Sequence, residues 1–212
     1  MPNPNEVTFL LYDLVRRVAL GRMNSREGRD AHMTKPELAA LDDLKEWGVD
    51  LLTDFEARHG VKVVQKLIGS GHIQVLESPV GEVAALAPTG YRHFGYAYRW
   101  YKPIASAMMD QLAMRLTVQT MQARGYAQAT SRSRTMARVV SPSGTPTYLM
   151  VKYRMPLSSA ITKTLQKLLE DGIEDNAEIF VFREQPHRLK AVFQRTHHRI
   201  VVEAPPWSGA LP

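Results

Sequence analysis

Cysteine is absent from this chain of 212 residues. The protein therefore forms no disulfide, and it offers no thiolate as a metal ligand or as a nucleophile. Other catalytic signatures are also absent: a Gly-x-Ser-x-Gly turn, a glycine-rich phosphate-binding loop, and a His-Glu-x-x-His or His-x-x-x-His pair. These absences make an enzyme the weaker interpretation, and we predict no catalytic residue, no metal and no cofactor.

Long apolar runs are absent as well. No segment approaches the roughly 18 to 20 apolar residues that a membrane-spanning helix requires. The first residues, MPNPNEVTFLLYDLVRR, carry an acid early and lack a small-residue cleavage site after a long apolar stretch, so they do not match a secretory signal. We therefore expect a cytoplasmic protein without a membrane partner.

Positive charge is in excess. The chain has 27 lysine and arginine residues against 21 aspartate and glutamate residues, which gives a net charge of +6. The sequence pI is about 9.6. This balance favours an anionic partner, of which nucleic acid is the commonest. The length allows one large domain or two small ones.

Thr34 begins the clearest helix of the sequence. Threonine is a preferred N-cap residue, Pro36 follows in the first turn, and Glu37 stands at the capping-box position. Gly48 is expected to end this helix. Upstream, apolar residues at helical spacing predict an amphipathic helix over residues 5–23.

Two short helices and a hairpin follow. The segment VDLLTDFEARHG predicts a third helix closed by Gly60, and residues 61–69 supply a fourth with a compact apolar stripe. The pattern then changes to strand, turn and strand in HIQVLES, PVG and EVAALAP. Helices followed by a two-stranded wing are the order of a winged helix-turn-helix, which we predict over residues 1–95.

The second half has a different order. A long helix is predicted over about residues 103–124, and two β-rich runs then surround a Ser-Pro-Ser-Gly-Thr-Pro turn. A helix over residues 157–171, the apolar strand AEIFVFRE and a terminal strand complete a mixed sheet covered by helices. The fold class is therefore α+β. We expect a separate α/β domain over residues 96–204 and a disordered tail over residues 205–212.

Two sequence patterns together resemble a known family. VKVVQKLIGSGHIQVLES runs from a helix into a strand, and the strand pair closes on Leu86-Ala-Pro-Thr-Gly90, as at the end of many bacterial winged helices. With the long helix, the hairpin and the strand-helix-strand segment, residues 50–202 resemble the replication-relaxation family of plasmids and other mobile elements. The resemblance implies a winged helix joined to a restriction-endonuclease-like core.

The nuclease-like part departs from an active enzyme. In such a core, acidic residues and a lysine on the central hairpin hold a divalent cation and activate water. Here Met150 and Lys152 occupy positions where acids are expected, and the strand TMARVVS offers no carboxylate. Hard cations need oxygen ligands, so we interpret this domain as catalytically inactive.

The candidate DNA contacts form three groups. Those in or beside the predicted fourth helix, off its apolar stripe, are Arg58, Lys62, Gln65 and Lys66. Those in the aromatic stretch YRHFGYAYRWYK are Arg92, Arg99 and Lys102. Those of the second-half hairpin are Arg132, Arg134, Arg138, Lys152 and Arg154. The structural alternatives are a solvated helix face, an aromatic joint between domains, and edge strands whose charge resists aggregation.

These observations favour a non-enzymatic DNA-binding protein that acts in replication, maintenance or regulation of a plasmid, mobile element or chromosome. Duplex DNA is the favoured partner, single strands are an alternative through aromatic stacking, and a homodimer stays open. One competing hypothesis is a metal-dependent nuclease or relaxase that gathers carboxylates from Asp110, Glu170, Asp171, Glu174 and Glu178. Another is a dimeric winged-helix transcriptional regulator whose interface is the methionine-rich face of the helix over residues 103–124, with Met108, Met109, Met114 and Met121.

Overall fold

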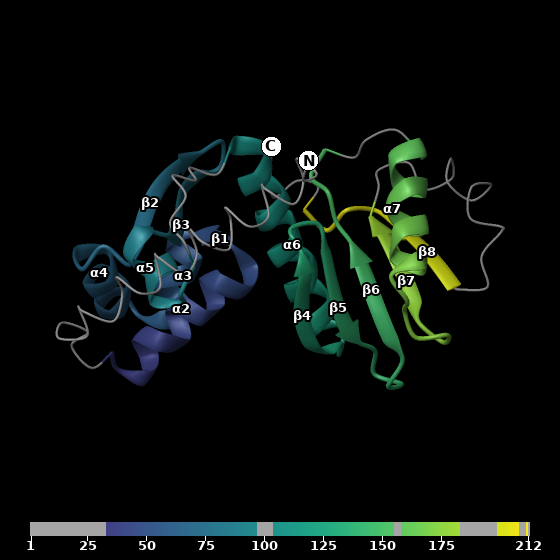
Figure 1. Ribbon diagram of the computed structural model, residues 1–212, viewed down its shortest axis with the longest axis horizontal. Helices are drawn as coiled ribbons and strands as arrows, with labels where there is room; N and C mark the ends of the chain where they lie inside the picture. Colours follow the sequence, from purple (N-terminus) through teal and green to yellow (C-terminus); the bar gives the residue numbers. More distant parts are fainter. Residues whose placement is uncertain (1–32, 97–103, 155–157, 183–198, 208–210, 212) are drawn as a thin grey trace, which may run out of the picture.

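The protein is an α+β chain with two sheets, one on each side of a long helix (Figure 1). This computed structural model describes residues 33–96, 104–154, 158–182, 199–207 and 211. The helix expected over residues 5–23 lies outside the described residues. Within the described ranges, no helix combines the length and the apolar character needed to cross a membrane.

The first half carries a three-stranded antiparallel sheet of order β1-β3-β2. Its elements are α2 (Lys35–Trp47), β1 (Val49–Leu51), α3 (Leu52–His59), α4 (Val61–Gly69), β2 (Ile73–Ser78), β3 (Gly81–Leu86) and α5 (Pro88–His93). The expected helix over VDLLTDFEARHG begins later than predicted. Its first three residues instead form β1, because they pair with β3 in the register Val49↔Ala85 to Leu51↔Val83.

The ends of α2 follow the local signals. The Thr34 backbone N–H donates to Glu37 Oε2 over 2.8 Å, which is one half of the predicted capping box. Gly48 follows the helix with φ +84°, and its N–H donates to the Leu44 carbonyl over 2.8 Å. The start and the end of this helix are therefore confirmed.

Gly90 lies where α5 meets the beginning of β2. A Cβ atom at this position would stand 2.4 Å from the backbone oxygen of His72 and 3.0 Å from Leu86 Cδ2. The same His72 oxygen accepts the N–H of Ala87 over 2.8 Å, so it cannot retreat without loss of that bond. The glycine of the Leu86-Ala-Pro-Thr-Gly90 segment thus permits a close backbone approach.

Gly90→Ala is therefore expected to lower the free energy of unfolding by about 1–3 kcal/mol, as overpacking against backbone does. Urea denaturation of the full chain measures this change. Gly69→Ala is the matched control, because nothing lies within 4 Å of its added Cβ. Equal stability of the Gly90→Ala variant and the parent would contradict the prediction.

The second half carries a five-stranded sheet of order β4-β5-β6-β7-β8. Its elements are α6 (Ala105–Ala123), β4 (Ala127–Ser133), β5 (Met136–Val140), β6 (Pro146–Met150), α7 (Ser158–Glu170), β7 (Glu178–Phe182) and β8 (Arg199–Glu203). Strands β4 to β6 are antiparallel, whereas β6, β7 and β8 are parallel. The predicted hairpin is the β5–β6 pair. Strand β4 was not expected.

Helices cover both faces of this sheet (Figure 1). Alternate residues of β6 and β7, such as Leu149 and Phe180, pack with the apolar side chains of α6. Their neighbours, such as Tyr148 and Ile179, pack with α7 through Leu165 and Leu168. The alternation follows from the pleat of a strand, whose successive side chains point to opposite faces.

One apolar core continues through α6 into the first half. Besides residues of the large sheet and α6, it includes Val49, Leu76, Val83 and Ala85 of the small sheet. Each half also has a cluster of its own, one around Phe55 and Leu67 in the first half and one around Leu165 and Ile179 in the second, so the expected division at residue 96 stays a prediction. The methionines expected at a dimer interface, Met108, Met109, Met114 and Met121, are at most 3% exposed and belong to this core, so they cannot form that interface.

The C-terminal segment also packs on the core. Trp207 is 4% exposed and its ring lies 6.1 Å from the Phe182 ring, measured between centroids. The backbone N–H of Leu211 donates to the Trp207 carbonyl over 3.0 Å, and Leu211 is buried. For these residues, the expected disordered tail is a wrong prediction, because the Trp207 ring packs against the apolar core beside Phe182.

Candidate nucleic-acid interface

Helix α4 presents a polar face to the exterior. Val64 and Leu67 are buried, whereas Lys62, Gln65 and Lys66 are exposed. Gly60, with φ +86°, separates α3 from α4 and lets the second helix start at once in a new direction. The structure therefore brings three of the predicted contact residues together on one surface.

These three side chains differ in their partners. Gln65 Nε2 donates to Glu56 Oε1 over 2.9 Å. Lys66 Nζ lies 2.5 Å from Glu37 Oε1, although the lysine side chain remains 64% exposed. Lys62 has no ion pair or hydrogen bond within the described part of the chain. It is therefore the cation of α4 most available to a phosphate.

The contact between Lys66 and Glu37 joins α4 to the first turn of α2. The hydrogen bond from Lys66, followed by that from the Thr34 backbone, lowers the pKa of the Glu37 carboxyl below its ordinary value. A phosphate that approaches Lys66 must share this lysine with Glu37. We therefore rank Lys66 below Lys62 as a DNA contact.

Arg58 has a structural role. Its guanidinium is paired with Asp50 and lies 3.1 Å from Asp43 Oδ2. His59 Nε2 lies 3.1 Å from the same Asp43 oxygen. The charge of Arg58 is thus largely neutralised within the fold, so a free phosphate contact through Arg58, as the sequence suggested, has no support in this geometry.

Arg115 of α6, which was not among the predicted site residues, is the centre of this ionic network. Its Nε donates to the Val49 carbonyl over 2.6 Å. Its Nη1 donates to Asp43 Oδ1 over 3.0 Å, and its Nη2 donates to the Asp43 carbonyl over 3.3 Å. The side chain is 7% exposed. Arg115 therefore fastens α6 to the end of α2 and to β1.

Burial sets the ionisation of this network. It lowers the pKa of Arg115 to about 10, against the opposing attraction of Asp43. Burial also acts to raise the pKa of Asp43, but the charge of Arg115 and the hydrogen bonds from His59, Arg115 and Arg58 outweigh it. The net pKa of Asp43 is therefore lowered, and the carboxylate stays charged.

The wing carries acids. Glu77 and Glu82 face each other across the β2–β3 hairpin, and both are exposed. Two neighbouring carboxylates repel phosphate.

In the second predicted group of contacts, from the aromatic stretch YRHFGYAYRWYK, Arg92 is exposed and donates to Thr89 Oγ1 over 3.1 Å. Arg99 and Lys102 lie outside the described residues.

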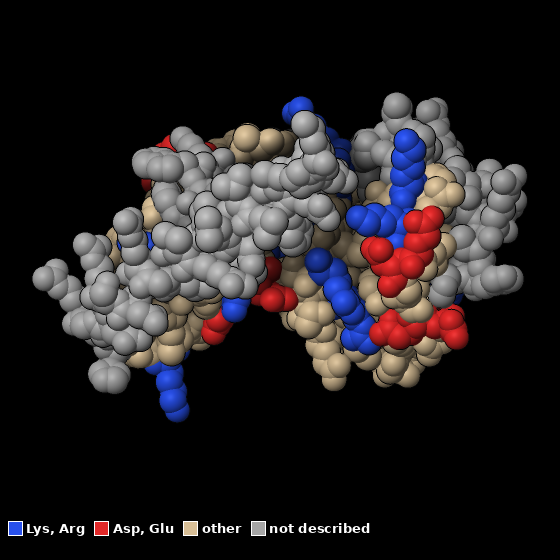
Figure 2. Space-filling model, viewed as in Figure 1, with Lys and Arg blue, Asp and Glu red and all other residues tan. Residues whose placement is uncertain are grey.

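The cations of the large sheet differ in their partners. Arg132, Lys152 and Arg154 are exposed and have no ion pair within the described residues. Arg134 lies 3.8 Å from Asp110, measured from Nε to Oδ2. Figure 2 shows cations over β4 and β5, with acidic side chains close by over α7 and the loop that follows it.

Arg138 is held by one of those acids. Its Nε and Nη2 donate to Glu174 Oε1 over 3.0 and 2.8 Å, and the Tyr148 hydroxyl donates to Glu174 Oε2 over 2.8 Å. The pKa of Glu174 is lowered to about 2 by a hydrogen bond from the backbone N–H of Glu174 itself, together with the hydrogen bonds from Tyr148 and Arg138. Arg138 is therefore a structural partner of Glu174, and the predicted phosphate contact has no free cation here.

The nuclease hypothesis has little support from the carboxylates. Asp110 Oδ1 accepts the N–H of Tyr153 over 3.0 Å, and burial raises the pKa of Asp110 although Lys152 and Arg134 act against that rise. Glu178 is paired with Arg199. Among the described residues, no three His, Asp or Glu side chains are placed to hold a metal ion. The carboxylates needed for that chemistry do not gather.

No protein-family model matches the chain, and neither a curated protein nor a solved structure matches it. The assignment of a function therefore depends on the arrangement of the residues themselves.

Proposed function

We propose that the protein is a non-enzymatic DNA-binding protein whose first half is a winged helix. The order α2-β1-α3-α4-β2-β3, with the sheet order β1-β3-β2, supports this proposal. In helix-turn-helix proteins the second helix of the pair lies in the major groove. Helix α4 is that helix here.

One observation carries the proposal: α4 holds its apolar side in the core while Lys62, Gln65 and Lys66 face outward. Lysine provides phosphate contacts that position a duplex, and glutamine can form two hydrogen bonds with an adenine edge. The acidic wing takes no part. Duplex binding through the α4 face is therefore the function that the geometry supports best.

The second half adds to this function without catalysis. The order α6-β4-β5-β6-α7-β7 in a mixed sheet supports a restriction-endonuclease-like core that lacks metal-binding acids. Its exposed cations, Arg132, Lys152 and Arg154, are suited to non-specific phosphate contacts. Such a protein acts in the cytoplasm in the replication, maintenance or regulation of a plasmid, mobile element or chromosome.

A salt titration of DNA binding tests the proposal. Labelled random duplex and single-stranded DNA are titrated with the full chain and followed by fluorescence anisotropy, with and without Mg²⁺. If about four phosphates are neutralised, duplex affinity should fall on the order of 100-fold between about 50 and about 200 mM salt. Absence of duplex binding at low salt would overturn the DNA-binding proposal. Cleavage that requires Mg²⁺ would overturn its non-enzymatic part.

A further inference from the structure

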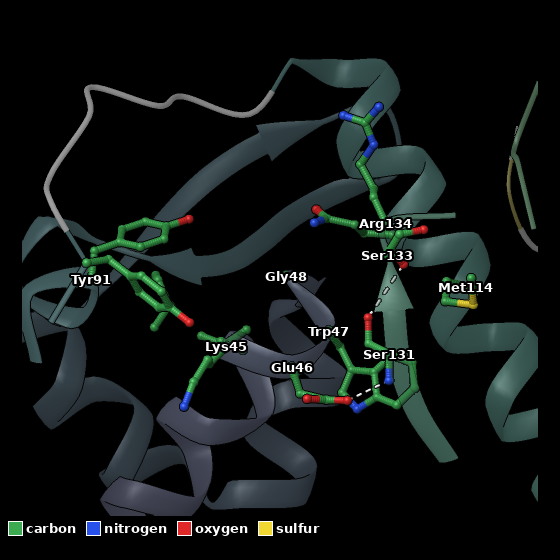
Figure 3. Close-up of a pocket in the computed structure, with 13 residues that line it drawn as sticks. Lys45, Glu46, Trp47, Gly48, Tyr91, Met114, Ser131, Ser133 and Arg134 are labelled. Atoms are coloured by element: carbon green, nitrogen blue, oxygen red, sulfur yellow. Dashed lines mark hydrogen bonds between the residues drawn. The ribbon is translucent and has the colours of Figure 1, made fainter. Parts of the chain in front are cut away.

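A cavity of about 440 Å³ lies between the end of α2 and the β4–β5 hairpin, and its walls come from both halves of the protein (Figure 3). Its charged side chains do not converge. Glu46 accepts the backbone N–H of Ser131, and Arg134 lies 3.8 Å from the Asp110 carboxylate. Lys45 and Arg134 lie at opposite ends of the cavity in Figure 3, so they cannot hold one ligand group together. On the outward face of α4, by contrast, two polar side chains meet.

These two side chains are Gln65 of α4 and Glu56 of α3. Gln65 Nε2 donates to Glu56 Oε1 over 2.9 Å, although the residues are nine positions apart in the sequence. Gly60, with φ +86°, lies between them and lets α4 turn away from α3 at once. The two helices lie in contact, and the hydrogen bond therefore crosses their junction.

The apolar core fixes both helices beneath this hydrogen bond. Phe55, the neighbour of Glu56, and Val64, the neighbour of Gln65, are both 0% exposed and belong to the same apolar cluster. Polar groups that stand on packed helices are held more precisely than groups on loops. The bond thus joins two positions that the core already holds, while the Gln65 side chain itself is exposed to a partner.

The chemistry of Glu56 determines how the Gln65 amide is turned. An ionised carboxylate only accepts hydrogen bonds, whereas a glutamine amide has two N–H donors at one end and an oxygen acceptor at the other. Only the Nε2 end of Gln65 can therefore face Glu56. This bond uses one N–H, and a second N–H and Oε1 remain to meet a partner.

One donor beside one acceptor matches the edge of a single base. In the major groove, adenine presents the N6 amine as a donor and N7 as an acceptor, whereas guanine presents two acceptors, N7 and O6. An amide of fixed orientation pairs with adenine when its Oε1 accepts from N6 and its Nε2 donates to N7. Guanine leaves the amide oxygen opposite another acceptor, so it is disfavoured.

We propose that Glu56 is a positioning residue that orients Gln65 to read an adenine in the major groove. Glu56 itself contacts no base in this arrangement, and its negative charge acts against phosphate binding. Its effect is therefore on selectivity and not on total affinity. This inference rests on the proposed duplex binding through α4, and it names the base that is read and the residue that makes the reading selective.

Selection from a pool of random duplexes with the full chain identifies the sites to be tested. The parent should enrich adenine at one position of its sites, and Gln65→Ala should lose that enrichment. In a selected duplex, this adenine is then replaced by 7-deazaadenine, which lacks the N7 acceptor, or by unsubstituted purine, which lacks the N6 amine. Each replacement should weaken parent binding roughly 3- to 10-fold, the value of one hydrogen bond. Neither should affect Gln65→Ala. Fluorescence anisotropy measures these affinities.

Glu56→Gln tests the positioning role. A glutamine at this position can donate as well as accept, so it no longer dictates the orientation of the Gln65 amide. The preference for adenine over guanine should fall about 3-fold or more, while total affinity rises because one negative charge is lost. Glu82→Gln on the wing is the matched control, because it removes an exposed acid and should leave the preference unchanged. Circular dichroism checks that both variants fold.

A preference that falls in Glu56→Gln alone supports the inference. An unchanged preference in Glu56→Gln, equal changes in Glu56→Gln and Glu82→Gln, or no enrichment of adenine by the parent would overturn it, with duplex binding left intact. Absence of duplex binding by the parent at low salt is a different result, since it would overturn the proposed function itself.

Discussion

Arg115→Leu is expected to lower the free energy of unfolding by about 3–5 kcal/mol, the cost of breaking a buried ion pair by removal of one partner. Arg115 is 7% exposed and donates to the side chain and carbonyl of Asp43 and to the carbonyl of Val49. Leucine would leave Asp43 without its main counter-charge, and Asp50, 4% exposed, would keep only Arg58. Asp50 is 4% exposed and Asp43 is 19% exposed, so water can replace the lost contacts only in part.

Urea denaturation of the full chain measures this loss, from the midpoint and slope of the transition. Arg124→Leu is the control on the same helix, because Arg124 is 47% exposed and pairs with Glu203 over 2.7 Å. An exposed pair contributes about 1 kcal/mol or less. Arg115→Lys should give an intermediate loss, since it keeps the charge without the planar fork. Equal losses for the two leucine variants would refute the central role of Arg115.

Lys62→Glu is expected to weaken duplex binding roughly 10-fold or more. It should also make the negative slope of log affinity against log salt shallower by about one to two. Lys62 is exposed on α4 and has no partner within the described part of the chain. Its reversal replaces a phosphate contact by repulsion and leaves the core beneath α4 unchanged. Fluorescence anisotropy across a salt series measures both quantities.

Lys167→Glu provides the same change of net charge at an exposed position of α7. In Figure 1 this helix lies on the far side of the large sheet from α4. If both substitutions weaken binding equally, the duplex responds only to net charge and α4 is not the recognition helix. A loss confined to Lys62→Glu supports that assignment.

Local signals in the sequence were sufficient for several elements. Thr34 and Glu37 predicted the start of α2, and Gly48 its end, because caps depend on residues within one turn. The two hairpins were predicted from their turn residues and the apolar runs beside them. In each case the residues that determine the structure are close in sequence.

Elements that depend on distant partners were missed. Strand β1 has three residues and exists because it pairs with β3, which begins thirty residues later. Strand β4 has the polar sequence AQATSRS and little burial on either face, so no alternation of apolar residues marks it. Both strands are defined by their neighbours in the sheet, and tertiary context overrides propensity here.

The candidate sites show the same division. The outward placement of Lys62 and Gln65 followed from helical spacing, whereas the fixed partners of Arg58 and Arg138 did not. In the Arg115 network, Arg115 bonds to Val49 and Asp43, which precede it in the sequence by 66 and 72 positions. The only local sign of this network is a charged residue in the apolar run QLAMRLTV. The cavity lining comes from both halves, so no single segment of sequence indicates it.

The position of α6 has a consequence for the energetics of the whole chain. Because this helix lies against both sheets within one continuous core, neither half can open without exposing apolar surface of the other. We therefore expect the unfolding of one half to destabilise the other through this shared apolar cluster. A ligand that binds only the folded form of either half stabilises its partner by thermodynamic linkage.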